Sequence, residues 1–89
     1  MEKIRRQYTF TGRVQGVGFR YNAKYAADLL GLTGWVSNDW DGRVTMEVQG
    51  TEEDIDRLIL RLQSHRWIRI DYISKRNLPL KEENGFRVR

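Results

Sequence analysis

The sequence contains no cysteine, and it has only one histidine and one proline among its 89 residues. Without cysteine there is no disulfide framework, no thiolate nucleophile and no cysteine-based metal cluster. No apolar run approaches the length that a helix needs to cross a bilayer. The charged residues after Met1 are not followed by the apolar segment that a signal peptide requires. These absences favour a cytoplasmic protein without a membrane partner.

The residues that are present indicate one folded domain over residues 1–89. Hydrophobic residues make up 39% of the chain and charged residues 31%, which is typical of a globular domain. The net charge of +4 favours anionic partners such as phosphorylated metabolites, nucleic acid or an acidic surface. The basic residues never form a block of five, so a mildly basic, solvated surface explains the charge equally well.

The first half of the chain predicts a strand, a loop and a helix. Residues 7–11 alternate between polar and apolar, as in a half-buried strand. Residues 12–18 contain three glycines and are expected to form a loop. From Phe19 onward apolar residues recur at helical spacing, and Gly31 follows as a C-terminal cap.

The middle of the chain predicts a hairpin followed by a second helix. Two strands are expected over residues 33–37 and 43–49, joined by a turn at residues 38–42 that contains an Asp-Gly pair. Thr51 then opens a helix, because acidic residues fill the first turn after it.

The remaining segments complete a recognisable order of elements. Residues 67–74 are strand-like, with Ile70 and Ile73 out of period as at a bulge, and Phe86 and Val88 mark a last strand. The order β-α-β-β-α-β plus one strand predicts the ferredoxin-like α+β class. We expect an antiparallel sheet with two helices on one face and a short extra C-terminal strand. Because this fold hosts many functions, it does not identify one.

The most informative segment lies between the first strand and the first helix, at residues 12–20. Its glycines allow successive backbone N–H groups to point inward as a concave nest for an anion. The N-terminus of the following helix adds a partial positive charge, and Arg20 can bind phosphate oxygens in a bidentate manner. A flexible connection followed by an ordinary surface arginine is the alternative. The spacing matches neither the Walker loop nor the dinucleotide motif.

This segment resembles the signature of the acylphosphatase family at every position from 12 to 20. Residues 31–38 resemble the second motif of that family, and residues 41–44 with Gly50 also fit. The closing residues 85–88 are similar to the usual ending. The chain departs from the family pattern at Asn22, where an apolar or aromatic residue is common, and at residues 64–67, which replace a Gly-Pro-rich turn.

The resemblance implies a substrate, a reaction and a set of site residues. The substrate would be a small acyl phosphate and one product inorganic phosphate. From the residues themselves we expect no metal or other cofactor, because the chain has no cysteine, one histidine and no carboxylate cluster. We also expect a monomer, because no feature of the sequence indicates an oligomer. Asn38 would position the attacking water. The phosphoryl group would be held by Gln15, Gly16, Val17, Gly18, Phe19 and the side chain of Arg20. Such a reaction needs no catalytic histidine, because a carboxylate with a pKa of about 4 leaves without a proton donor.

Other polar residues have simpler interpretations. The only histidine, His65, falls at the expected end of the second helix and is interpreted as a helix-end residue. Asp39 and Asp41 are possible metal ligands, but turn chemistry explains them better. Alternation does not decide whether the core or the rim contains the three tryptophans, which are Trp35, Trp40 and Trp67.

Two other classes of function share some of these features. RNA-recognition modules have the same order of elements, but they need aromatic residues on the open face of the sheet. Here that face is expected to present polar residues such as Thr9, Glu47 and Gln49, so no nucleic-acid partner is predicted. A phosphate-binding module without turnover, as in a domain of a larger maturation protein, is the second alternative. A chain that starts at methionine and ends with the last strand favours the enzyme.

Overall fold

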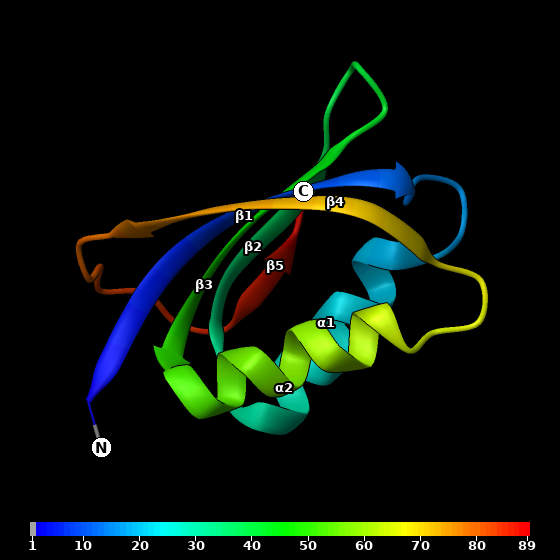
Figure 1. Ribbon diagram of the computed structural model, residues 1–89. Coiled ribbons are helices and arrows are strands. Elements are labelled where there is room, and N and C mark those ends of the chain that lie inside the picture. The colour runs from blue at the N-terminus through cyan, green and yellow to red at the C-terminus, as the bar shows by residue number, and fades with distance from the viewer. Residues whose placement is uncertain (1) are drawn as a thin grey trace.

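A computed structural model describes residues 2–89 as a five-stranded sheet with two helices on one face (Figure 1). In chain order the elements are β1 (Lys3–Arg13), α1 (Phe19–Leu30), β2 (Thr33–Asn38), β3 (Val44–Thr51), α2 (Glu52–Gln63), β4 (Arg69–Leu78) and β5 (Phe86–Val88). The strands lie in the order β4-β1-β3-β2-β5. The expected ferredoxin-like α+β class is confirmed. Four strands pair antiparallel, and β5 adds a parallel pairing with β2 that makes the sheet mixed.

The core lies between the helices and the inner face of the sheet. Every second residue of β1 and β3 faces the helices, so Tyr8 lies opposite Met46 and Phe10 opposite Val44, all four buried. The helices complete the core with their apolar sides, which are formed by Ala23, Ala26 and Ala27 of α1 and by Ile55, Leu58 and Leu62 of α2. Removing these side chains from water is the main stabilising term, at about 25 cal/mol per Å² of apolar surface.

Local signals placed the helix ends correctly, with one small difference. Gly31 ends α1 in the left-handed region at φ 69°, and the Thr51 side chain accepts a hydrogen bond from the Asp54 N–H at 3.2 Å. Helix α2 ends at Gln63, so His65 lies just beyond it. There the ring Nδ1 of His65 accepts a hydrogen bond from the Trp67 N–H at 3.2 Å.

Strands β1 and β4 are longer than their alternation indicated. Strand β1 extends to Lys3, which pairs with Thr51 of β3, and β4 extends to Leu78, which pairs with Arg5 of β1. The expected bulge in β4 is confirmed, since the register shifts opposite Thr11 and Gly12. Strand pairing thus extends through charged segments that have no periodic pattern.

The structure also places the three tryptophans that alternation left undecided. Trp40, at the tip of the β2–β3 hairpin, is 98% exposed, and Trp67 is exposed as well. Trp35 is half-buried on the open face of the sheet, with the guanidinium of Arg89 4.3 Å from its ring centroid. None of the three therefore belongs to the core. Neither helix between residues 2 and 89 is long and apolar enough to cross a membrane.

Candidate functional site

The glycine-rich loop between β1 and α1 is fixed at both ends by buried apolar side chains. Val14 and Phe19 are each 1% exposed, and the ring of Phe19 packs on that of Phe10 with centroids 4.9 Å apart. Val17 packs partly buried against the same core. The apolar residues therefore hold the loop against the protein, and the glycines between them leave its backbone accessible.

A side chain of the loop also fixes it to the neighbouring hairpin. The Gln15 Nε2 donates to the carbonyl oxygen of Asp39 at 2.7 Å and to that of Arg43 at 2.9 Å. These two residues flank the turn that follows Asn38, and the Asp39 N–H donates to the Arg43 carbonyl at 2.8 Å. These hydrogen bonds fix the distance between the glycine-rich loop and the end of β2, where Asn38 lies.

The loop reaches α1 through backbone that only glycine adopts readily. Gly16 has φ 72° and Gly18, the N-cap of α1, has φ 79°. Within residues 2–89, no side chain caps the N-terminus of α1, and its first turn has no acidic residue. By contrast, α2 has the Thr51 cap and three acidic residues in its first turn. The N–H groups and the positive end of α1 are therefore available to an anion.

A pocket of about 150 Å³ opens where the loop, the start of α1 and the end of β2 meet. It is lined by Val14, Gly16, Gly18, Phe19, Arg20, Tyr21 and Asn38. This volume lies below the roughly 300–1,000 Å³ of pockets that take drug-sized ligands, so the pocket suits a small group such as a phosphate. Arg20 is the only charged residue among these lining residues, so the pocket favours an anion.

The orientation of Arg20 depends on a residue far along the chain. Its Nη1 donates to the backbone carbonyl oxygen of Arg89 at 2.8 Å. The Arg89 N–H in turn donates to the Val36 carbonyl at 2.8 Å, which holds residue 89 against β2. One contact leaves most of the five guanidinium N–H donors of Arg20 free for a ligand.

Asn38 is the last residue of β2 and faces the same pocket. Within the described residues its side chain has no hydrogen-bond partner, so both the donor and the acceptor of the amide are available to a water. Its neighbours are engaged in the turn. The Thr45 hydroxyl donates to the Asp39 carboxylate at 2.7 Å, and Asp41 pairs with Arg43 at 2.7 Å. The hydrogen bonds from Arg43 lower the pKa of the Asp41 carboxyl.

The pocket brings together most of the residues predicted from the sequence. Five of the predicted residues line it, namely Gly16, Gly18, Phe19, Arg20 and Asn38. The side chain of Gln15 points to the hairpin instead, and that of Val17 packs against the core. This arrangement leaves those two residues able to contribute backbone N–H groups only.

Sequence reasoning did not identify several contributors. Val14, inside the motif, and Tyr21, the residue that follows it, also line the pocket, and these positions were a usable signal. Asn22 donates to the Gly18 carbonyl at 2.8 Å, so the departure from the family pattern supports the turn into α1. No local sequence pattern could have linked Arg89 to the site, because the two residues are 69 positions apart and only the folded sheet brings Arg89 to Arg20.

Metal ligands do not cluster in the part of the chain that is described. Among residues 2–89, no three His, Cys, Asp or Glu side chains lie together in a way that could hold a metal ion. The positive charge that the lining residues themselves offer comes from Arg20 and from the N-terminus of α1.

This geometry defines a protein of the ferredoxin-like α+β class with one small pocket suited to an anion at the N-terminus of α1. The pocket has the size and charge for a phosphoryl group, and the uncharged amide of Asn38 faces it.

Comparison with known proteins defines the class further. The family model described as Acylphosphatase matches residues 6–88. An acylphosphatase from Clostridium perfringens is 43% identical over 78 residues, which are 86% of this chain and 88% of its own. One from Bifidobacterium longum is 37% identical over 83 residues, 92% of this chain and 86% of its own. The crystal structure of acylphosphatase from Bacillus subtilis superposes with a TM-score of 0.89 at 31% identity, covering 96% of this chain and 97% of that one. The chain belongs to the acylphosphatase family, and like its relatives it is a hydrolase of acyl phosphates.

The same fold occurs inside a much larger protein. Full-length HypF, solved in a phosphate- and nucleotide-bound form, contains a matching segment with a TM-score of 0.89 and 34% identity. The match covers 98% of this chain but only 12% of that one.

Proposed function

We propose that residues 1–89 act as a single domain that hydrolyses the carboxyl–phosphate anhydride of an acyl phosphate to a carboxylate and inorganic phosphate. In this proposal the phosphoryl group lies in the 150 Å³ pocket at the N-terminus of α1. The N–H groups of residues 15–19 and the guanidinium of Arg20 bind its oxygens. The observation that carries the proposal is the convergence of the open helix N-terminus, Arg20 and Asn38 on one small pocket.

The chemistry requires positioning and charge stabilisation rather than a strong acid or base. Asn38 holds a water in line with the bond to be broken, and the water oxygen attacks phosphorus. The bond between phosphorus and the acyl oxygen breaks, and the carboxylate leaves with the electron pair. The water proton passes to a phosphate oxygen. The negative charge on the equatorial oxygens is stabilised by Arg20 and the backbone donors.

A metal-free assay tests this proposal. We expect hydrolysis of benzoyl phosphate and acetyl phosphate to continue unchanged in excess chelator, because the proposed site uses an arginine and backbone donors in place of a metal. Activity that disappears with chelator and returns with a divalent ion would contradict the proposed mechanism. Inorganic phosphate should inhibit competitively, since it occupies the same nest.

The similarity to a segment of HypF supports a second candidate, a phosphate-binding domain without turnover. The same assay separates the two. A binding domain would take up inorganic phosphate and gain thermal stability from it, but it would not release carboxylate from an acyl phosphate.

The remaining parts of the proposal concern partners and location. We propose a monomer that acts in the cytoplasm on small molecules, without a nucleic-acid or membrane partner. Analytical ultracentrifugation of the protein alone tests the monomeric state, and the same measurement with RNA tests for a nucleic-acid partner. Cell fractionation tests the cytoplasmic location and the absence of a membrane partner.

A further inference from the structure

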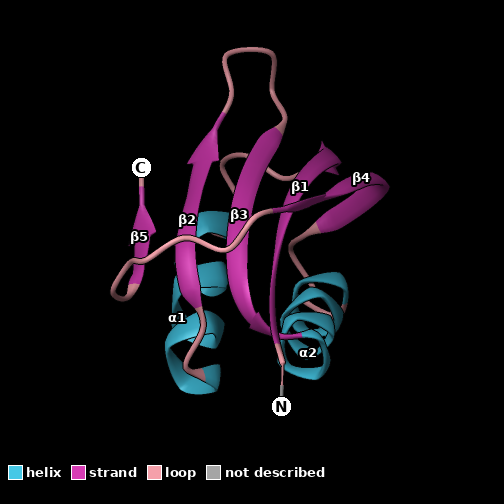
Figure 2. Cartoon of the chain, turned by 90° about the vertical axis from the view of Figure 1, so that its left-hand side faces the viewer, coloured by secondary structure: helices cyan, strands magenta, loops and turns pink. Residues whose placement is uncertain are grey.

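The segment between β4 and β5 crosses the open face of the sheet. The two strands lie at opposite edges in the order β4-β1-β3-β2-β5, so residues 79–85, named here the crossover, must pass over the three strands between them. Figure 2 shows the crossover running over the face opposite the helices before it turns into β5. The position of β5 therefore depends on what holds the crossover.

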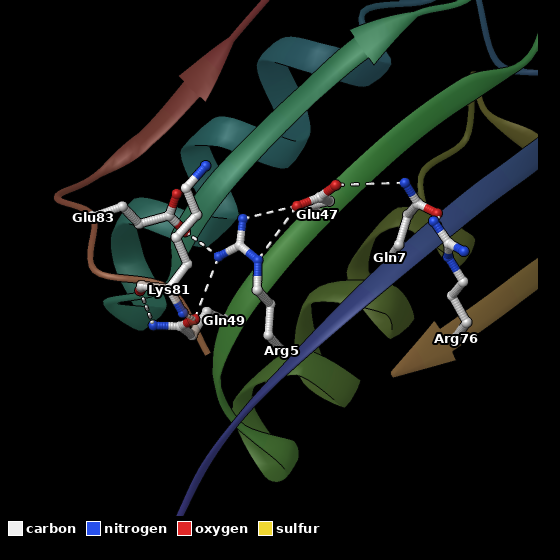
Figure 3. Close-up of polar contacts among 7 residues, drawn as sticks. All are labelled: Arg5, Gln7, Glu47, Gln49, Arg76, Lys81 and Glu83. Carbon is white, nitrogen blue, oxygen red and sulfur yellow. Dashed lines mark hydrogen bonds and ion pairs between the residues drawn. The ribbon is translucent and has the colours of Figure 1, made fainter. Parts of the chain in front are cut away.

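One attachment is made by a buried arginine of β1. Arg5 is 2% exposed although it lies on the open face of the sheet, and it forms ion pairs with Glu47 of β3 and Glu83 of the crossover (Figure 3). Its Nη2 lies 3.0 Å from Glu47 Oε1, and its Nη1 contacts Glu83 Oε1. Burial disfavours the charge of Arg5, but the hydrogen bonds to Glu83 and Glu47 outweigh it and raise its pKa.

A second attachment is made by Gln49 of β3. Its Nε2 donates to the Lys81 carbonyl at 2.9 Å, and its Oε1 accepts from the Lys81 N–H at 2.9 Å (Figure 3). The side-chain amide thus pairs with the backbone of the crossover as a neighbouring strand would. It also accepts from Arg5 Nη1 at 3.3 Å, so both attachments belong to one network.

The crossover leads directly to the residue that contacts Arg20. At its last residue, the Gly85 carbonyl accepts a hydrogen bond from the Gly34 N–H at 3.1 Å, and β5 then pairs with β2. One residue beyond β5, the Arg89 carbonyl accepts from Arg20 Nη1 at 2.8 Å. A displacement of the crossover would therefore move the only protein acceptor that the described residues provide for Arg20.

We infer that Arg5 and Glu83 are positioning residues for Arg20. By clamping the crossover they set the place of β5, and β5 sets the place of the Arg89 carbonyl. The inference rests on the proposed role of Arg20 in holding the phosphoryl group. It assigns a function to a charged cluster outside the pocket, on the opposite side of the sheet from the helices.

The experiment compares two neighbouring acids of the crossover. Glu83→Gln removes the charge that pairs with Arg5 but keeps a hydrogen-bonding side chain of the same shape. Glu82→Gln makes the same change at an exposed position whose side chain has no polar partner within residues 2–89. For both, the inhibition constant for inorganic phosphate and the kcat/KM for benzoyl phosphate are measured well below the melting temperature. Amide hydrogen exchange of Lys81 and Arg89 is followed in parallel.

We expect Glu83→Gln to weaken phosphate inhibition and lower kcat/KM by about threefold to tenfold, the range of coupling through a packed network. Exchange at Lys81 and Arg89 should become faster. Glu82→Gln should match the parent chain in every measurement. Arg5→Lys should act in the same direction, because a point charge cannot bond to two carboxylates and an amide as a guanidinium does.

Two outcomes would overturn the inference. In the first, Glu83→Gln lowers the melting temperature but leaves phosphate inhibition and kcat/KM of the folded protein unchanged, so the cluster only stabilises the fold. In the second, Arg20→Lys itself leaves phosphate inhibition intact, and the proposed function then fails together with the inference. If Arg20→Lys loses inhibition and Glu83→Gln does not, the proposed function stands and only the positioning role is wrong. Should Arg5→Lys fail to fold, Glu83→Gln alone decides.

Discussion

The side-chain amide of Gln15 lies 2.7 Å from the backbone carbonyl oxygen of Asp39 and so joins the anion-binding loop to the hairpin that presents Asn38. The family signature includes Gln15, and the structure shows that its side chain points to the hairpin rather than into the pocket. The two parts of the site come from different elements, and their separation depends on this contact. Several expectations depend on the same geometry.

Gln15→Ala should loosen the link between loop and hairpin while leaving both parts in place. We expect a fall in kcat of roughly tenfold or more, because small displacements of positioned groups have large effects on rate. Phosphate inhibition should change less, since Arg20 and the helix N-terminus remain. Gln63→Ala, at the exposed end of α2, is the control. An unchanged kcat in Gln15→Ala would show that the contact is dispensable.

Arg20→Lys should abolish most activity even though it keeps the positive charge. Lysine cannot form the planar, bidentate contact with phosphate, and its single ammonium lacks the rigid fork that lets a guanidinium bind phosphate and the Arg89 oxygen from separate nitrogens. Phosphate inhibition and turnover should decline together. Arg61→Lys, exposed in the last turn of α2, serves as the matched substitution. Near-normal turnover in Arg20→Lys would show that a point charge suffices.

Asn38→Ala should separate chemistry from binding. In the proposed mechanism Asn38 holds the water and does not contact phosphate, so kcat should fall by on the order of a hundredfold. The inhibition constant for phosphate should change little. If Asn38 served only the turn, the variant would melt earlier, but its folded fraction would keep full turnover. Asn77→Ala, exposed on β4, controls for the loss of a surface amide.

Gly16→Ala and Gly31→Ala form a matched pair at opposite ends of the α1 region. Their φ values are 72° and 69°, and no described atom would lie within 4 Å of an added Cβ at either position. Each alanine should therefore cost about 1–2 kcal/mol of folding free energy through left-handed strain alone. For a domain of this size that corresponds to a loss of roughly 4–8 °C in Tm per kcal/mol. Only Gly16→Ala should also weaken phosphate inhibition. Equal phosphate affinity in the two variants would contradict a role for the Gly16 backbone in the nest.

The free energy of unfolding should decrease at alkaline pH, because the hydroxyl of Tyr8 is buried in the folded protein and loses its proton more readily in the unfolded chain. Burial raises the pKa of its hydroxyl above 10.0, against the opposing hydrogen bond from Arg6. The folded state therefore keeps the proton at a pH where the unfolded chain has lost it. Stability is fully present below about pH 10 and is lost as the pH rises through the folded pKa. Urea unfolding between pH 8 and pH 11 should show a steeper decline for the parent than for Tyr8→Phe. Tyr25→Phe, at an exposed site, should behave as the parent.

Features set by neighbouring residues were open to prediction from the sequence. The limits of α1, the Thr51 cap, the alternation in β3 and the glycine spacing of residues 12–18 all follow from backbone preferences and side-chain period, which act within a few residues. The same holds for the placement of Arg20 at the start of a helix. These signals, with the family resemblance, were enough to predict the fold class and the residues of the proposed site.

Contacts between distant segments were decided only by the tertiary structure. Arg20 and Arg89 are 69 residues apart, and Gln15 and Asp39 are 24 apart, so no local pattern links them. Arg5 looks like a solvent-exposed charge in the sequence, yet the crossover covers it and two acids pair with it. The parallel pairing of β5 with β2 likewise joins segments that lie far apart in the chain. The physical reason is that closing such long loops depends on the summed burial and hydrogen bonding of the whole sheet, which no single segment carries.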